Sequence, residues 1–168
     1  MHSGLEGVFR AVALCLLALV ARQSFALEPG QPAPQLLLQS GSDARQVPVA
    51  GRLTYVDFWA SWCGPCRKSF PWMNEMHRKY AASGLEIVAV NLDQERADAG
   101  EFLARLPAEF PVVYDAAGEA PTRYGVKGMP TSVLVGADGN VIAVHAGFNE
   151  KDAAALEDMI RSHLEARP

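Results

Sequence analysis

Hydrophobic residues fill some stretches of the chain continuously and recur at helical spacing in others. Residues 53–59 and 85–92 are nearly unbroken apolar runs, the pattern of parallel strands that are covered on both faces. Residues 131–135 and 141–146 are rich in β-branched side chains and flank an Asp-Gly turn, which predicts an antiparallel hairpin. The pattern therefore predicts an α/β fold in which strands alternate with helices.

The hydrophobic and polar pattern of the remaining residues predicts four helices and three short strands. Pro71 lies inside the first helix, where it removes a backbone donor and is expected to bend the helix. We predict a three-layer sandwich, with a mixed central sheet and helices on both faces. The helices are expected over residues 64–82, 94–106, 119–124 and 152–166, and the short strands over 36–38, 46–49 and 111–114.

Residues 1–26 have the layout of an export signal. Arg10 precedes an apolar run over residues 11–21, and Ser24 and Ala26 are small residues at the usual cleavage positions. The run is too short to span a bilayer comfortably, since about 20 apolar residues are needed. We expect cleavage after Ala26, which leaves one domain over residues 27–168. An uncleaved signal that anchors the protein to the membrane is the alternative.

The net charge of the chain bears on which classes of partner it can bind. The chain carries 15 Lys and Arg against 19 Asp and Glu, a formal net charge of −4. A mildly acidic domain of mixed charge counts against nucleic acid or an anionic membrane surface as the partner. Of the three cysteines, Cys15 lies in the predicted signal. The mature chain would keep only Cys63 and Cys66, so no separate structural disulfide is possible within it.

The most informative segment is WCGPC at residues 62–66, directly after the apolar run that predicts a strand. A strand that ends in Cys-x-x-Cys and continues as a helix places Cys63 at a helix N-terminus, where the dipole favours a thiolate. Cys66 would lie within bridging reach. This arrangement indicates thiol-disulfide chemistry, in which an exposed Cys63 attacks a disulfide and a buried Cys66 resolves the mixed disulfide.

Half of a structural zinc site is the other common meaning of Cys-x-x-Cys. Zinc needs four ligands, and the remaining candidates are scattered without a paired spacing. We therefore expect no metal and no cofactor. His145, inside a β-rich run, is expected to be a strand residue rather than a ligand or base. The other candidate ligands are Cys15, His2, His77 and His163.

With these residues in view, the chain resembles the thioredoxin superfamily, and more narrowly its exported TlpA/ResA-type reductases. Residues 56–66 resemble the active-site strand and turn, Pro71 matches the helix-kinking proline, and residues 123–131 resemble the segment around the family's cis-proline. The interval from Cys66 to Pro130 is longer than in thioredoxin itself. The resemblance thus implies a thioredoxin-like fold with an N-terminal extension and an inserted helix and strand.

The same resemblance implies functional roles. Trp62 and Met129 would flank the cysteines as an apolar contact surface, and Pro130 would be cis, although Trp62 could instead pack in the core. Gly64 and Pro65 would start the helix, and Gly-Pro between the cysteines goes with reducing members of the family. Further implications are a periplasmic location, exported disulfide-bearing clients, a membrane electron donor of the DsbD/CcdA type and a monomer.

Asp57, on the strand before the cysteines, matches the family's buried acid. Desolvation raises a carboxyl pKa, so Asp57 could accept the Cys66 proton; alternatively it only satisfies backbone groups. The family's partner lysine is missing, since residues 85–92 contain none.

Two further departures concern the ResA type. Ser69 stands where that type often has an acid, and Thr131 follows Pro130 where cytochrome-maturation reductases often have Glu. Both count against a dedicated role in haem attachment. A copper-handling or redox-dependent binding module remains the alternative function, in which the two thiols would hold Cu(I).

Overall fold

One mixed sheet runs through the computed structural model, which describes residues 27–166. The predicted signal over residues 1–26 lies outside the described residues. Across the sheet the strand order is β2-β1-β5-β4-β3-β6-β7. The strands are β1 (Leu36–Ser40), β2 (Asp43–Val47), β3 (Leu53–Trp59), β4 (Leu85–Asn91), β5 (Val112–Tyr114), β6 (Thr131–Val135) and β7 (Val141–Ala146).

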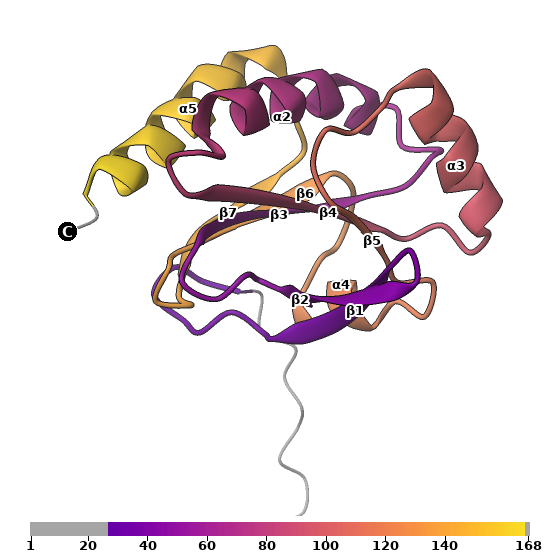
Figure 1. Cartoon of the computed structure of the whole chain (residues 1–168), viewed down its shortest axis with the longest axis horizontal. Helices are drawn as coiled ribbons and strands as arrows, with labels where there is room; N and C mark the ends of the chain where they lie inside the picture. The colour runs from indigo at the N-terminus through magenta and orange to yellow at the C-terminus, as the bar shows by residue number, and fades with distance from the viewer. Residues whose placement is uncertain (1–26, 167–168) are drawn as a thin grey trace, which may run out of the picture.

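Helices cover both faces of this sheet, which confirms the predicted three-layer sandwich (Figure 1). Three of them, α2, α3 and α5, lie over one face, and the short α4 lies over the other. No helix within residues 27–166 combines the length and apolar character needed to cross a membrane. The helices are α2 (Cys66–Tyr80), α3 (Arg96–Arg105), α4 (Glu119–Arg123) and α5 (Glu150–Glu165).

The central strand β3 is buried along its whole length. It pairs in parallel with β4 and antiparallel with β6. Because side chains alternate across a strand, Tyr55 and Trp59 enter the hydrophobic cluster on the α2 face, whereas Val56 and Phe58 enter the cluster on the α4 face. Asp57 therefore points towards α2, the helix that begins with the second cysteine.

Most predicted elements are confirmed, and the differences lie at their ends. The strand predicted over 36–38 continues to Ser40 as β1, and the one predicted over 46–49 is β2 at Asp43–Val47, because the two strands pair from Leu36 opposite Val47 to Ser40 opposite Asp43. The first helix begins at Cys66 rather than Gly64, because Gly64 and Pro65 form the turn that leads into it. The last helix begins at Glu150, earlier than predicted, because the Asn149 side chain accepts the backbone N–H of Lys151 and caps it. The predicted insertion is present as α3 and β5.

Candidate functional site

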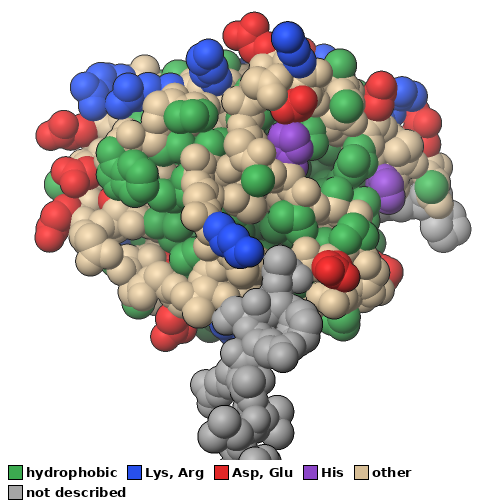
Figure 2. Space-filling model, turned by 180° about the vertical axis from the view of Figure 1, so that it is seen from behind, with side chains coloured by type: hydrophobic (Ala, Val, Ile, Leu, Met, Phe, Trp, Pro, Cys, Tyr) green, Lys and Arg blue, Asp and Glu red, His purple; other side chains and the backbone are tan. Residues whose placement is uncertain are grey.

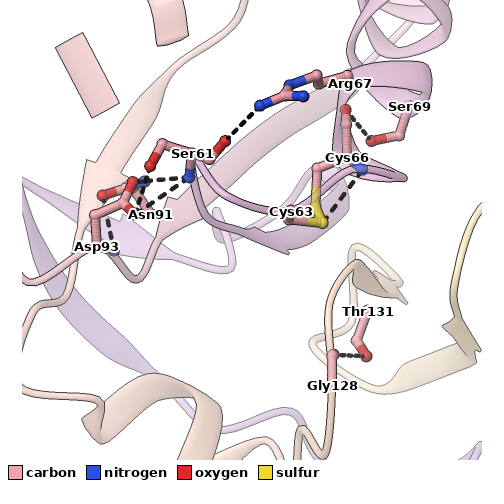
Figure 3. The surroundings of a disulfide bond; sticks show 9 residues. All are labelled: Ser61, Cys63, Cys66, Arg67, Ser69, Asn91, Asp93, Gly128 and Thr131. Carbon is pink, nitrogen blue, oxygen red and sulfur yellow. Dashed lines mark hydrogen bonds between the residues drawn. A yellow bond between two sulfur atoms is a disulfide. The ribbon is translucent and has the colours of Figure 1, made fainter. Parts of the chain in front are cut away.

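Cys63 and Cys66 form a disulfide where β3 leads into α2 (Figure 3). Cys63 is 4% exposed and Cys66 is fully buried, and both belong to the hydrophobic cluster under α2. The predicted order of exposure is therefore right. The prediction of an openly exposed Cys63 is wrong for the disulfide form, because both half-cystines are packed into that cluster.

The first turn of α2 is directed at the Cys63 sulfur. The backbone N–H of Cys66 donates to Sγ of Cys63 at 3.2 Å. No side chain caps this helix, and no acidic residue lies in its first turn. The sulfur thus occupies the place of a capping oxygen, where unpaired N–H groups and the helix dipole stabilise negative charge.

Gly64, Pro65 and Ser69 shape this turn. Pro65 is the residue that precedes α2, and the Gly64 carbonyl accepts the N–H of Arg67 at 3.2 Å, as expected for residues that start the helix. Ser69 is buried, and its hydroxyl donates to the Cys66 carbonyl at 3.1 Å. Where the ResA type often has an acid, this protein therefore has a serine whose hydroxyl is hydrogen-bonded to the backbone.

Asp57 is a buried carboxyl without a counter-charge. It is 1% exposed, and its Oδ2 has no hydrogen-bond partner. Ala89 lies opposite it on β4, so the strand that would carry the family's lysine offers no cation there. Burial raises the pKa of Asp57 well above its ordinary value. The neutral acid is favoured, and the carboxylate, once formed, is a stronger base than an exposed one.

An acidic side chain that the sequence analysis missed holds the start of the active-site turn. Asp93, just beyond β4, accepts the backbone N–H of Ser61 at 2.9 Å and its hydroxyl at 2.9 Å. The Asn91 side chain donates to the same carboxyl at 2.8 Å. Figure 3 shows these three residues gathered at the end of the turn away from the cysteines. Parallel pairing of β3 with β4, which brings their carboxyl ends together, was the available signal.

Met129 and Pro130 form the second side of the site. The Met129–Pro130 peptide bond is cis, as the resemblance implied, and Pro130 is buried. Met129 packs against the cluster that contains both cysteines. The Thr131 hydroxyl donates to the Gly128 carbonyl at 2.7 Å and closes this loop (Figure 3). A second cis bond, Val47–Pro48, was not predicted.

Apolar surface lies around the site. Trp62 is 70% exposed, which excludes the alternative that it packs in the core. A groove of about 450 Å³ starts at Met129 and Pro130 and continues to Val144 on the edge strand β7, with Lys127 on its wall. In Figure 2, apolar side chains gather on the middle of the rear face and charged side chains lie mainly around its rim. Such surface suits an extended protein segment.

Within residues 27–166, no three His, Cys, Asp or Glu side chains gather in a way that could hold a metal ion. Trp59 and Trp72 pack in the core cluster. The chemistry that the site offers is that of a dithiol and disulfide beside a buried acid.

Comparison with known proteins places this site among related ones. Residues 28–160 match the Redoxin family. The thiol-disulfide oxidoreductase ResA of Bacillus thuringiensis subsp. konkukian is 34% identical over 137 residues, which cover 80% of this chain and 78% of the relative. ResA of Bacillus subtilis is 31% identical over 140 residues, covering 82% of this chain and 75% of the relative.

Solved structures agree with these relatives. A Chlorobium tepidum protein described as a thiol:disulfide interchange protein DsbE superposes with a TM-score of 0.80 and is 49% identical, covering 83% of this chain and 99% of that one. StoA of Bacillus subtilis gives a TM-score of 0.66 at 27% identity, covering 79% of this chain and 99% of that one.

Proposed function

Because the chain belongs to the Redoxin family and is a thiol-disulfide oxidoreductase of the thioredoxin superfamily, we propose that it reduces disulfides of exported client proteins. The observation that carries the proposal is the Cys63–Cys66 disulfide at the start of α2, with the Cys66 N–H directed at the Cys63 sulfur. The Gly-Pro spacer between the cysteines supports the reducing direction.

The first step belongs to Cys63. In the reduced protein its thiolate attacks one sulfur of the client disulfide, and a bond forms between Cys63 and that sulfur while the client bond breaks. The released client thiolate takes up a proton from water. The helix N-terminus favours the attacking thiolate because its dipole and its unpaired N–H groups stabilise negative charge.

The second step belongs to Cys66 and Asp57. The Asp57 carboxylate takes the proton of the Cys66 thiol, and the new thiolate attacks Sγ of Cys63. The second client sulfur leaves as a thiolate and is protonated. The client has gained two electrons and two protons, and the protein ends in the disulfide form described above. The raised pKa of Asp57 suits this role, because a base works best when its pKa approaches that of the thiol.

Client binding would use the apolar surface around the cysteines. Trp62 offers a large exposed ring, and the Met129–Pro130 loop offers backbone groups to an extended client strand. Among the residues that line the groove only Lys127 is charged, which favours clients that present an unfolded, apolar segment around their disulfide.

The family relationship also supports a proposal for where the protein acts and which partner supplies its electrons. We propose that the signal over residues 1–26 directs the protein to the periplasm, where a membrane donor of the DsbD/CcdA type reduces the Cys63–Cys66 disulfide after each cycle. We further propose that the domain acts as a monomer. The oxidising periplasm would keep client disulfides available as substrates.

Reduction of insulin disulfides in the presence of dithiothreitol tests the activity, with Cys63→Ser and Cys66→Ser as variants. Wild type should accelerate precipitation of the insulin B chain, and both variants should fall to the rate of dithiothreitol alone. Mass spectrometry without dithiothreitol should find a mixed disulfide on Cys66→Ser only, because resolution is blocked. A wild-type rate equal to that of dithiothreitol alone would contradict the proposal; stoichiometric Cu(I) binding in that event would favour the copper-handling alternative.

A further inference from the structure

Asp57 needs a route by which a proton can leave. The carboxyl is 1% exposed, its Oδ2 has no partner, and β3 is covered on both faces. In the proposed second step it receives a proton from Cys66 once in every cycle. A buried acid that must return to its carboxylate form requires neighbours that pass the proton towards water.

A row of polar residues crosses the sheet from Asp57 to the outer edge. Ser132 on β6 lies directly opposite Asp57, and His145 on β7 lies directly opposite Ser132. Opposite residues of antiparallel strands share one face, with Cβ atoms about 4.5–5.5 Å apart. The three side chains therefore stand next to one another on the face that α2 and α5 cover.

Tyr55 strengthens the middle of this row. Its hydroxyl donates to Oγ of Ser132 at 2.8 Å, and both groups are buried. Burial, and then the charge of Asp57, raise the pKa of Tyr55, so its hydroxyl keeps its proton. Asp57 lies two residues along β3 from Tyr55, on the same face of the sheet.

A small cavity connects this pair with His145. It measures about 10 Å³ and is lined by Tyr55, Ser132 and His145, and otherwise by apolar side chains of β6, β7 and α5. This volume is close to the smallest that holds one water molecule. Nε2 of His145 is buried and has no hydrogen-bond partner. The cavity thus lies between the His145 side chain and the two residues that carry the hydroxyl groups.

The outer end of the row is Asp152, in the first turn of α5. Its Oδ2 lies 3.4 Å from Nε2 of His145, in a contact that is not aligned as a hydrogen bond, and its side chain is 37% exposed. The Asn149 side chain donates to the same oxygen. The polar groups that face His145 are thus Tyr55 from β3, Ser132 from β6 and Asp152 from α5, with Asp57 beyond Ser132.

We propose that Ser132 and His145, supported by the Tyr55 hydroxyl, relay protons between Asp57 and the solvent at Asp152. The relay rests on the proposed function, since it removes the proton that Asp57 takes from Cys66. The proton passes from the carboxyl to the hydroxyl pair, across the cavity to Nε2, and out beside Asp152. No electrons move, and each relay group ends as it began. Imidazole suits the position next to solvent because its ring nitrogens can both accept and donate a proton.

Stopped-flow mixing of the reduced protein with excess dithiobis(nitrobenzoate) separates the two chemical steps. Attack by Cys63 releases one coloured thiolate, and resolution by Cys66 releases a second. His145→Gln and Ser132→Ala test the relay, and His163→Gln on the exposed side of α5 is the matched histidine control. We expect unchanged first phases and a second phase slowed about tenfold, less than the 10²–10⁴ that a direct acid-base group contributes.

Imidazole added to the buffer distinguishes a relay from a structural effect. It should restore the second phase of His145→Gln, because a mobile base can replace the missing one, and should leave His163→Gln unchanged. A second phase equal to wild type in both relay variants would overturn the proposal, as would a slowed phase that imidazole does not restore. A wild type that releases no coloured thiolate would instead overturn the proposed function, and the relay with it.

Discussion

At the scale of single residues, the buried Asp57 carboxyl makes the fold less stable near neutral pH, where the same group is ionised in the unfolded chain. A carboxyl that is buried without a partner or a cation opposes ionisation, and only burial is needed to explain its raised pKa. In the proposed mechanism, the same burial makes the Asp57 carboxylate a stronger base for the Cys66 proton. The cost of burying this carboxyl predicts the sign of the stability change when Asp57 is replaced.

Asp57→Asn should stabilise the oxidised protein near neutral pH. The unfolded carboxyl ionises near its ordinary pKa of 3.8, whereas burial keeps the folded pKa well above that value. Above 3.8 the unfolded state binds fewer protons, so the stability of wild type falls as pH rises towards the folded pKa. The gain of the variant should grow by about 1.4 kcal/mol for each pH unit in this window.

Urea unfolding at a series of pH values checks this prediction. The two proteins should differ least near pH 3 and most at neutral pH, and the exposed Asp43→Asn should show no such trend. Equal pH dependence of Asp57→Asn and wild type would mean that Asp57 is not a buried, neutral acid.

The same substitution should slow the chemistry while it stabilises the fold. Asp57→Asn cannot take the Cys66 proton, so the second phase of thiolate release should slow by roughly 10²-fold and its pH dependence between about pH 6 and 9 should change. The first phase, which belongs to Cys63, should stay close to wild type. A second phase unaltered across this pH range would remove Asp57 from the mechanism.

At the scale of elements, the active-site turn is fixed at both ends. Asp93 holds Ser61 at its start, and the N–H of Cys66 meets the Cys63 sulfur at its end. The turn is thereby held by a side chain just beyond β4 and by the first residue of α2. Both contacts use side-chain atoms to satisfy backbone donors that the turn leaves unpaired.

Loss of the Asp93 contact should loosen the turn. Asp93→Ala leaves the half-buried N–H of Ser61 unpaired, which should lower the free energy of unfolding by about 1–3 kcal/mol. Ser61→Ala removes only the hydroxyl bond and should cost about 0.5–1.5 kcal/mol. Urea unfolding gives both values, and amide exchange at Ser61 should accelerate in Asp93→Ala alone. Equal losses of unfolding free energy in Asp93→Ala and Ser61→Ala would contradict this account of the Asp93 contacts.

At the scale of the whole molecule, the sequence predicts elements better than it predicts contacts. The bounds of β3, β6 and β7 are as predicted, because apolar or β-branched runs end there in turn residues. The sequence did not reveal the contacts of Asp93 with Ser61 or the polar row through Ser132, because both depend on which strands become neighbours in the sheet. The burial of Cys63 was missed for a similar reason, since it depends on packing within the cluster under α2.

Export is a property of the whole chain and has its own test. Expression with residues 1–26 intact, followed by fractionation and mass measurement, should recover a periplasmic protein that begins at Leu27. Recovery of the full-length chain in the membrane fraction would instead support the uncleaved anchor. A chain that stays full-length in the cytoplasm would contradict export.

The central claim is that the Cys63–Cys66 pair cycles reversibly and donates electrons. Equilibration in glutathione buffers of graded potential, with the bridged fraction read by alkylation and mass spectrometry, measures it directly. We predict a two-electron transition with a midpoint nearer the roughly −270 mV of thioredoxin than the roughly −120 mV of a strong oxidant. A pair that never opens, or a midpoint close to the oxidant value, would contradict the account.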